Sequence, residues 1–81
     1  MEETYPMLIK IIDIAEKANI DPAKLMGKIS FFIKSTPEIP LDVEEKVHYS
    51  EMMVRFLAKN EKNEMAYQII KMLLEAIKEY I

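Results

Sequence analysis

The stretch that decides the fold is residues 14–29, which read IAEKANIDPAKLMGKI. Asn19 is suited to end a helix, because asparagine tolerates the left-handed conformation found just beyond a helix C-terminus. Asp21-Pro22 signals the next helix, since aspartate can cap free amides and proline supplies the φ of the first helical position. Ile20 and Leu25 have the spacing of a hydrophobic staple at this entry. The stretch is therefore expected to join two helices through a tight turn.

Helical segments extend on both sides of this turn. Apolar residues at helical spacing predict four helices, over residues 5–18, 22–34, 43–59 and 64–80. Pro37 and Pro40 break the pattern within residues 35–41, a length that suits a crossover between two helix pairs. We therefore expect an all-α fold. It would be a small four-helix bundle of two antiparallel helical hairpins joined by a Pro-containing crossover, with residues 1–81 as a single domain.

Polar residues at the helix starts and one apolar stripe on each helix refine this prediction. Thr4 and Asn63 are expected to cap the first and fourth helices, and Asp42 with Glu45 has the pattern of a capping box. The inward stripes are expected to comprise Leu8, Ile11, Ile12, Ala15 and Ala18; Leu25, Met26, Ile29, Phe32 and Ile33; Val43, Val47, Val54 and Leu57, widened by Tyr49, Met53 and Phe56; and Ala66, Ile69, Ile70, Leu73, Ile77 and Tyr80.

The composition narrows the class of function. Cysteine is absent, which excludes disulfides, thiolate metal sites and cysteine nucleophiles. A net charge of −3 is not the basic balance of a non-specific nucleic-acid binder. No apolar run approaches the length of a membrane span, and the acidic start of the chain is unlike a secretory signal. These features favour a cytoplasmic protein that does not bind membranes.

Residues with catalytic or ligand chemistry are few. His48 is the single histidine. Glu44 and Glu51 share its helix face and could assist a metal, but a solvated polar face is the far commoner explanation. Arg55 is the single arginine, and the lysines are dispersed rather than gathered for an anionic substrate. The single glycine, Gly27, lies within a helix and cannot form a phosphate-binding loop. We therefore expect no enzyme activity, no cofactor and no small-molecule substrate.

The fourth helix is apolar around most of its circumference. In a four-helix domain of this size no helix is expected to be central enough to bury such a surface, so part of it is expected to face a partner. The residues that fall off the inward stripes are predicted to be contact anchors: Met65, Met72, Leu74, Ile81, Met7 and Ile14. Ordinary gap-filling by methionine is the plainer alternative. The leading hypothesis is a protein-interaction module, either a homo-oligomer or a small accessory subunit of a larger assembly.

Residues 14–29 also resemble the helix-turn-helix of DNA-binding repressors. Ala15 is small enough for close helix approach, Asn19 occupies the turn, and Ile20 would anchor it. The resemblance implies a dimeric DNA-binding regulator whose second helix offers side chains to the major groove, namely Pro22, Ala23, Lys24, Met26 and Lys28. The acidic net charge and the lack of Arg, Asn or Gln on that helix make this the alternative rather than the leading hypothesis.

Overall fold

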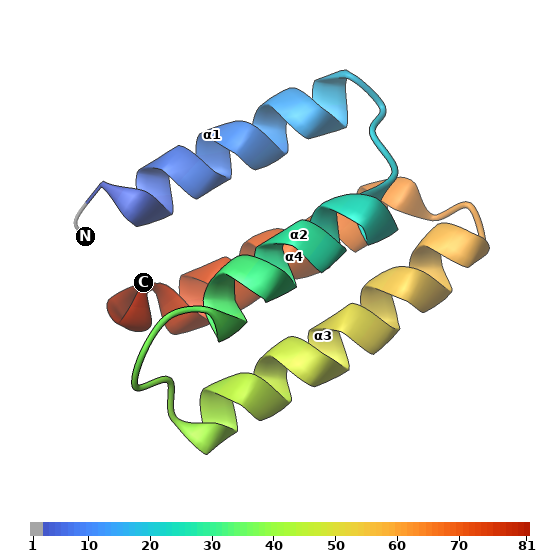
Figure 1. Ribbon diagram of the computed structural model, residues 1–81. Helices are drawn as coiled ribbons and strands as arrows, with labels where there is room; N and C mark the ends of the chain where they lie inside the picture. Colours follow the sequence, from blue (N-terminus) through green and yellow to red (C-terminus); the bar gives the residue numbers. More distant parts are fainter. Residues whose placement is uncertain (1–2) are drawn as a thin grey trace.

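The computed structural model describes residues 3–81, which fold into four α-helices and a short 3-10 helix. The helices are α1 (Thr4–Lys17), α2 (Pro22–Lys34), α3 (Leu41–Lys59) and α4 (Asn63–Ile77), followed by η1 (Lys78–Tyr80). No strand occurs in this described part of the chain. Consecutive helices run antiparallel, and the proline-containing segment 35–40 links the two hairpins (Figure 1). The predicted small four-helix bundle is confirmed.

The turn between α1 and α2 has the geometry that its sequence predicts. Asn19 adopts a φ of 55°, in the left-handed region. The amide of Ile20 donates to the carbonyl of Ala15 at 3.0 Å, and the amide of Asn19 donates to that of Glu16 at 3.1 Å. This pair of bonds is a Schellman motif, which satisfies the last carbonyls of α1. The Asp21 carboxylate then accepts from the Ala23 amide at 3.0 Å and caps α2.

The other predicted caps are wrong. Thr4 lies inside α1, and neither Glu3 before it nor Lys62 before α4 makes a side-chain cap bond. Asn63 is the first residue of α4, so it does not cap that helix. Helix α3 begins at Leu41 directly after Pro40, which places Asp42 in the first turn. The negative charge of Asp42 still interacts favourably with the positive N-terminal end of the helix dipole, although its carboxylate caps no amide.

Helix α4 occupies the centre of the bundle. It contacts α1, α2 and α3, whereas α1 packs mainly against α4 and hardly touches α2. In Figure 1, α2 lies in front of α4 while α1 and α3 run on either side. Even so, the bundle does not bury α4 on all sides, because Met65 and Met72 remain exposed as expected. The buried residues of α4 span an arc of about 120°, and half-buried Ile69 and Lys71 flank that arc on either side.

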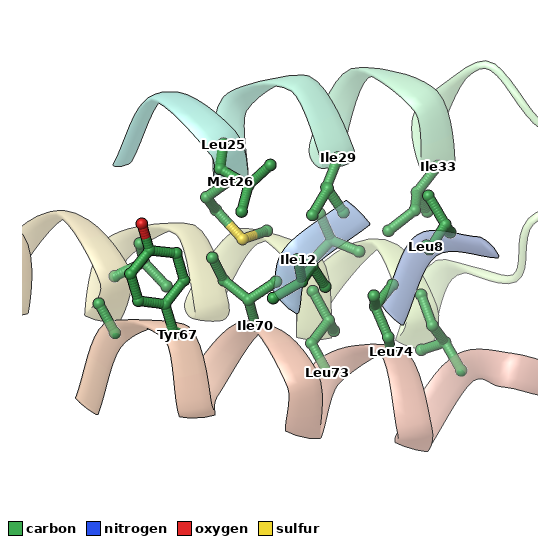
Figure 2. Packing of buried hydrophobic residues seen from close by; sticks show 14 of the residues in the cluster. Leu8, Ile12, Leu25, Met26, Ile29, Ile33, Tyr67, Ile70, Leu73 and Leu74 are labelled. Carbon is green, nitrogen blue, oxygen red and sulfur yellow. The ribbon is translucent and has the colours of Figure 1, made fainter. Parts of the chain in front are cut away.

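The core fills the space between α4 and the other helices. Figure 2 shows Leu25, Met26, Ile29 and Ile33 of α2 facing Tyr67, Ile70, Leu73 and Leu74 of α4, with Leu8 and Ile12 of α1 completing the contact. Two of these, Tyr67 and Leu74, were not expected on the inward stripe, yet both are buried. Several residues expected inside are exposed instead: Ile11, Ala18, Phe32, Tyr49, Met53, Phe56 and Tyr80. Helix α1 packs mainly on α4, and α3 packs on α2 and α4 alone among its main contacts, so the buried arcs of α1 and α3 are narrower than that of α4.

None of the helices within residues 3–81 combines the length and apolar character needed to cross a bilayer.

Candidate functional site

The predicted contact anchors on α4 divide into exposed and buried residues. Met65 and Met72 are exposed, with Met72 64% accessible. Leu74 is fully buried, so its prediction as an external anchor is wrong. Ile81 is half-buried and packs against the core, so it is not an open anchor either. On a helix the buried residues Leu73 and Tyr67 bound an arc of about 120°, and Leu74 lies within it while Met72 lies outside.

An apolar surface runs along the line where α3 meets α4. Tyr49 and Met53 of α3 and Met72 of α4 line a shallow cleft of about 330 Å³, with half-buried Ile69 and buried Leu73 at its base. Met53 and Phe56 are three residues apart, and Met65 lies seven residues before Met72, so helical spacing continues the surface on both helices. We call this the α3–α4 surface and define it by five side chains: Tyr49, Met53, Phe56, Met65 and Met72.

The α3 side of this surface was missed by the interface prediction, which placed its residues in the core. Tyr49 is 60% and Phe56 65% exposed, because α3 lies at the edge of the bundle and α2 and α4 cover only its inner side. The inner side of α3 is built from valines, whereas its outer side carries methionine and aromatic residues. Such a contrast on one helix is a usable sequence signal, since aromatic residues and methionine are enriched at protein interfaces.

Charged residues of opposite sign border the two sides of the α3–α4 surface. Lys59 lies one turn after Phe56 on α3, near the turn that leads into α4, whereas Arg55 pairs with Glu51 on the side of α3 that faces α2. Glu64 lies at the start of α4, and Glu75 follows on the same edge three turns later. The surface is therefore apolar along its centre, and near the α3–α4 turn it has Lys59 on its α3 edge and Glu64 on its α4 edge. At the other end Lys46 lines the cleft, and Glu75 is held by Tyr5 and Lys78.

Met7 and Ile14, the predicted anchors on α1, are exposed but belong to a different face. Ile14 lines a cleft of about 310 Å³ between α1 and α2, together with Ile11, Ile20 and Leu25. Met7 lies one turn before Ile11 and two turns before Ile14, on the same side of α1. The predicted single interface formed by the first and fourth helices is therefore two separate surfaces.

The helix-turn-helix residues are only partly available. The turn itself is formed as described, and Lys24 and Lys28 are exposed. Pro22 and Met26, however, are buried in the core, and Ala23 is half-buried. The prediction that Pro22 and Met26 reach into a DNA groove is wrong, because their side of α2 packs onto the rest of the bundle.

Tyr67 fastens α4 to this turn from inside the bundle. Its ring is buried, and its hydroxyl donates toward the carbonyls of Ala15, at 3.3 Å, and of Ile20. Desolvation raises the pKa of Tyr67, and the nearby charges of Glu16 and Asp21 raise it further. The neutral hydroxyl is thereby kept as a donor to the turn.

Several of the remaining polar contacts join α1 to α4 at the bundle exterior. The Lys71 ammonium lies 3.1 Å from the Asp13 carboxylate and 3.0 Å from that of Glu16, and hydrogen bonds to both raise the pKa of Lys71. The Tyr5 hydroxyl donates to Glu75 at 2.5 Å. These contacts hold α1 against α4, and they occupy both carboxylates of α1.

Glu51 of α3 makes the polar contacts that join α3 to α2. It accepts a hydrogen bond from the Ser30 hydroxyl at 2.8 Å and lies 3.3 Å from the Lys34 ammonium and 3.5 Å from the Arg55 guanidinium. Burial raises the pKa of Glu51, but the Ser30 and Lys34 hydrogen bonds and the charges of Lys34 and Arg55 lower it by more. The net shift is downward, so the carboxylate is stabilised in its charged form.

His48 lies on the exposed side of α3, with its ring centroid 5.7 Å from that of Tyr49. Among residues 3–81, no three His, Cys, Asp or Glu side chains are grouped so that they could hold a metal ion. The described titratable side chains instead form the interhelical contacts above or face solvent.

Comparison of the chain with protein-family models, with curated proteins and with solved structures finds no match.

Proposed function

We propose that this protein is a non-enzymatic protein–protein interaction module that self-associates, with a second copy bound on the α3–α4 surface. The observation that carries the proposal is the alignment of large exposed side chains on two adjacent helices. Tyr49, Met53 and Phe56 follow 4-3 spacing on α3, and Met65 and Met72 border the same line from α4. This spacing lets each helix present a continuous apolar ridge to a facing helix.

The size of the surface fits a small dimer interface. A phenylalanine or tyrosine can bury about 200 Å², so Tyr49 at 60% and Phe56 at 65% exposure each offer about 120 Å². With the three methionines, the five side chains offer about 600 Å², which is the upper end for the largest apolar patch on a monomer. A stable interface buries about 800 Å² on each partner, and the polar edges of the surface can supply the difference.

The charges favour one arrangement of the two copies. A two-fold axis running along α3 and α4 would place α3 of each copy over α4 of the other, with antiparallel direction. Residues at the same height then face each other, so that Lys59 of one copy approaches Glu64 of the second. A two-fold axis across the helices would instead oppose α3 to α3 in antiparallel direction and would place Lys59 away from Glu64. We therefore propose the lengthwise axis, because it pairs Lys59 of each copy with Glu64 of the other.

The test is the solution mass measured by multi-angle light scattering over a hundredfold range of concentration. We expect a dimer for the unmodified protein, and a monomer for Met72→Asp and for Phe56→Asp, because each would bury an unpaired charge in the interface. Both residues are exposed in the bundle, so circular dichroism should show unchanged helical content. Phe31→Asp is the matched control: Phe31 is 75% exposed on α2, outside the α3–α4 surface, and this variant should remain dimeric.

A monomer at every concentration would overturn self-association. So would a dimer that is lost equally in Phe31→Asp, because the effect would then be independent of the α3–α4 surface. A dimer that persists in both Met72→Asp and Phe56→Asp would place the interface elsewhere.

A further inference from the structure

A second apolar cleft, separate from the α3–α4 surface, lies between α1 and α2. Helix α1 rests on α4 and barely contacts α2, so the two helices of this hairpin leave a cleft of about 310 Å³. Its walls carry Ile11 and Ile14 from α1, Leu25 from α2, and Ile20 from the turn. The three isoleucines are 44–59% exposed. β-Branched side chains have few rotamers, so these walls are preformed rather than adaptable.

Exposed apolar side chains continue from the cleft toward the far end of the hairpin, and we call the cleft together with these side chains the α1–α2 groove. Met7 precedes Ile11 by one turn on α1, and Phe32 follows Leu25 by two turns on α2; both side chains are exposed. From Met7 to the end of α1 the groove is about 15 Å long, which corresponds to about three turns of a docked helix. A helix of that length would present apolar side chains at positions i, i+3 or i+4, and i+7.

Lysines border this groove on both sides. Lys24 and Lys28 line the cleft from α2, while Lys10 and Lys17 lie one turn from Ile14 on α1. Within residues 3–81, none of these four lysines forms an ion pair, and the carboxylates of α1 are held by Lys71 on the opposite flank. Helix α2 contains no acidic residue. A protein with a net charge of −3 thus concentrates unpaired positive charge along one apolar groove.

We infer that the α1–α2 groove binds an amphipathic helix of another protein, whose apolar stripe is flanked by aspartate or glutamate. The apolar side chains would occupy the space between Ile14, Ile20 and Leu25, and the flanking acids would meet Lys24 and Lys28 on one side and Lys10 and Lys17 on the other. The lysine stems can cover the edges of the bound helix while their ammonium groups remain solvated. Opposite charge would speed association and exclude basic helices.

This binding site is independent of the proposed dimer. The groove belongs to the α1–α2 hairpin and shares no residue with the α3–α4 surface. Each copy of a dimer would therefore keep its groove accessible, and the protein could link two copies of the same acidic helix. Failure of either proposal leaves the other intact.

The experiment measures the fluorescence anisotropy of two labelled synthetic peptides, each about 18 residues long, which is five helical turns. Both have leucines at i, i+4, i+7 and i+11; one carries glutamate at the flanking positions and the other lysine. We expect saturable binding of the glutamate peptide, at least tenfold tighter than that of the lysine peptide in low salt. Added salt should weaken it, because exposed charges are screened.

Three variants locate the binding. Lys28→Glu should weaken the glutamate peptide about fivefold or more, and Ile14→Asp at least tenfold, because a carboxylate would then face the apolar stripe of the peptide. The matched control is Lys62→Glu, a charge reversal in the turn between α3 and α4, and it should change affinity less than twofold. Ile14 is 59% exposed, and Lys28→Glu provides a second probe that leaves the apolar walls unchanged.

Several results would overturn the inference: equal binding of the two peptides, no saturable binding of either, or equal effects of Lys28→Glu and Lys62→Glu. The protein can also be tested against phosphatidylserine-containing vesicles and duplex DNA. If either binds, if Lys28→Glu abolishes that binding, and if the glutamate peptide does not compete with it, then the groove binds an anionic membrane or nucleic acid and not an acidic helix. Loss of the dimer in Ile14→Asp would assign the groove to a second copy of the chain.

Discussion

Helices α3 and α4 carry similar amounts of apolar side chain and use them in opposite ways. In α4 most of it is buried, including Tyr67 and Leu74, whereas α3 buries three valines and exposes its aromatic residues and methionines. The difference comes from position in the bundle: α4 has a neighbour on three sides, and α3 lies at the edge. The number of neighbours around a helix, rather than its own apolar content, decides how much of it is left for a partner.

The largest expected effect tests the contrast between α4 and α3 by the free energy of unfolding. Leu74→Ala should lower the free energy of unfolding by about 2–5 kcal/mol, because it opens a cavity in a closed part of the core. Phe56→Ala removes a larger side chain from α3 but should cost about 0.5 kcal/mol or less, because the ring is exposed. Urea unfolding checks both changes in the Met72→Asp background, so that association does not contribute. Similar losses of unfolding free energy in the two variants would contradict the difference in burial between α4 and α3.

A smaller effect is expected at the contact between α4 and the α1–α2 turn. Tyr67→Phe keeps the buried ring and removes the hydroxyl that donates to the Ala15 and Ile20 carbonyls, so the unfolding free energy should fall by about 1 kcal/mol. Hydrogen exchange should quicken first at the amides of the turn. Tyr49→Phe is the matched control on α3: its ring is exposed, and we expect no measurable change. A loss of stability in Tyr49→Phe alone would contradict the central role of α4.

The ionic contact of α3 with α2 should give a stability that depends on pH. The folded state lowers the pKa of Glu51, so its contribution is fully present above the unfolded pKa and is lost as pH falls through the folded one. Glu51→Gln should therefore cost about 1 kcal/mol near pH 7, and the difference from the unmodified protein should shrink below about pH 4. Thermal unfolding from pH 3 to pH 7 checks this. A difference that stays constant with pH would show that the Glu51 charge is not what links α3 to α2.

The smallest effect concerns the charged edges of the α3–α4 surface. Lys59→Glu should weaken the dimer about threefold, which is the scale of an exposed ion pair. If Lys59 faces Glu64 of the second copy, adding Glu64→Lys should restore most of the affinity. Sedimentation equilibrium at low salt provides the measurement. Additive losses in the double variant would argue against the lengthwise two-fold axis.

Local signals in the sequence predicted most of the fold. The turn at Asn19 and the start of α2 at Asp21-Pro22 are confirmed, because each depends on backbone conformation and on hydrogen bonds within a few residues. The caps at Thr4, Asp42 and Asn63 were wrong, since many residues can begin a helix once packing holds it in place. The second left-handed C-terminus, at Glu61 with a φ of 59°, was not foreseen, because glutamate carries no preference for that conformation.

The candidate surfaces were predicted less completely. Met65, Met72, Met7 and Ile14 are exposed as expected, but the structure distributes them over two faces, and Leu74 belongs to the core. The aromatic residues of α3 were expected inside. Periodicity places residues on one side of a helix, but it gives no information on how many other helices cover that side.

By itself, then, the sequence determined the four helices, their antiparallel order and the turn between the first two, because capping, backbone conformation and apolar spacing act over a few residues. Only the tertiary structure decided which helix is central, and with it the burial of Leu74 and Tyr67 and the exposure of Tyr49 and Phe56. Burial is a property of neighbours in space, and those neighbours are set by how all four helices share one core.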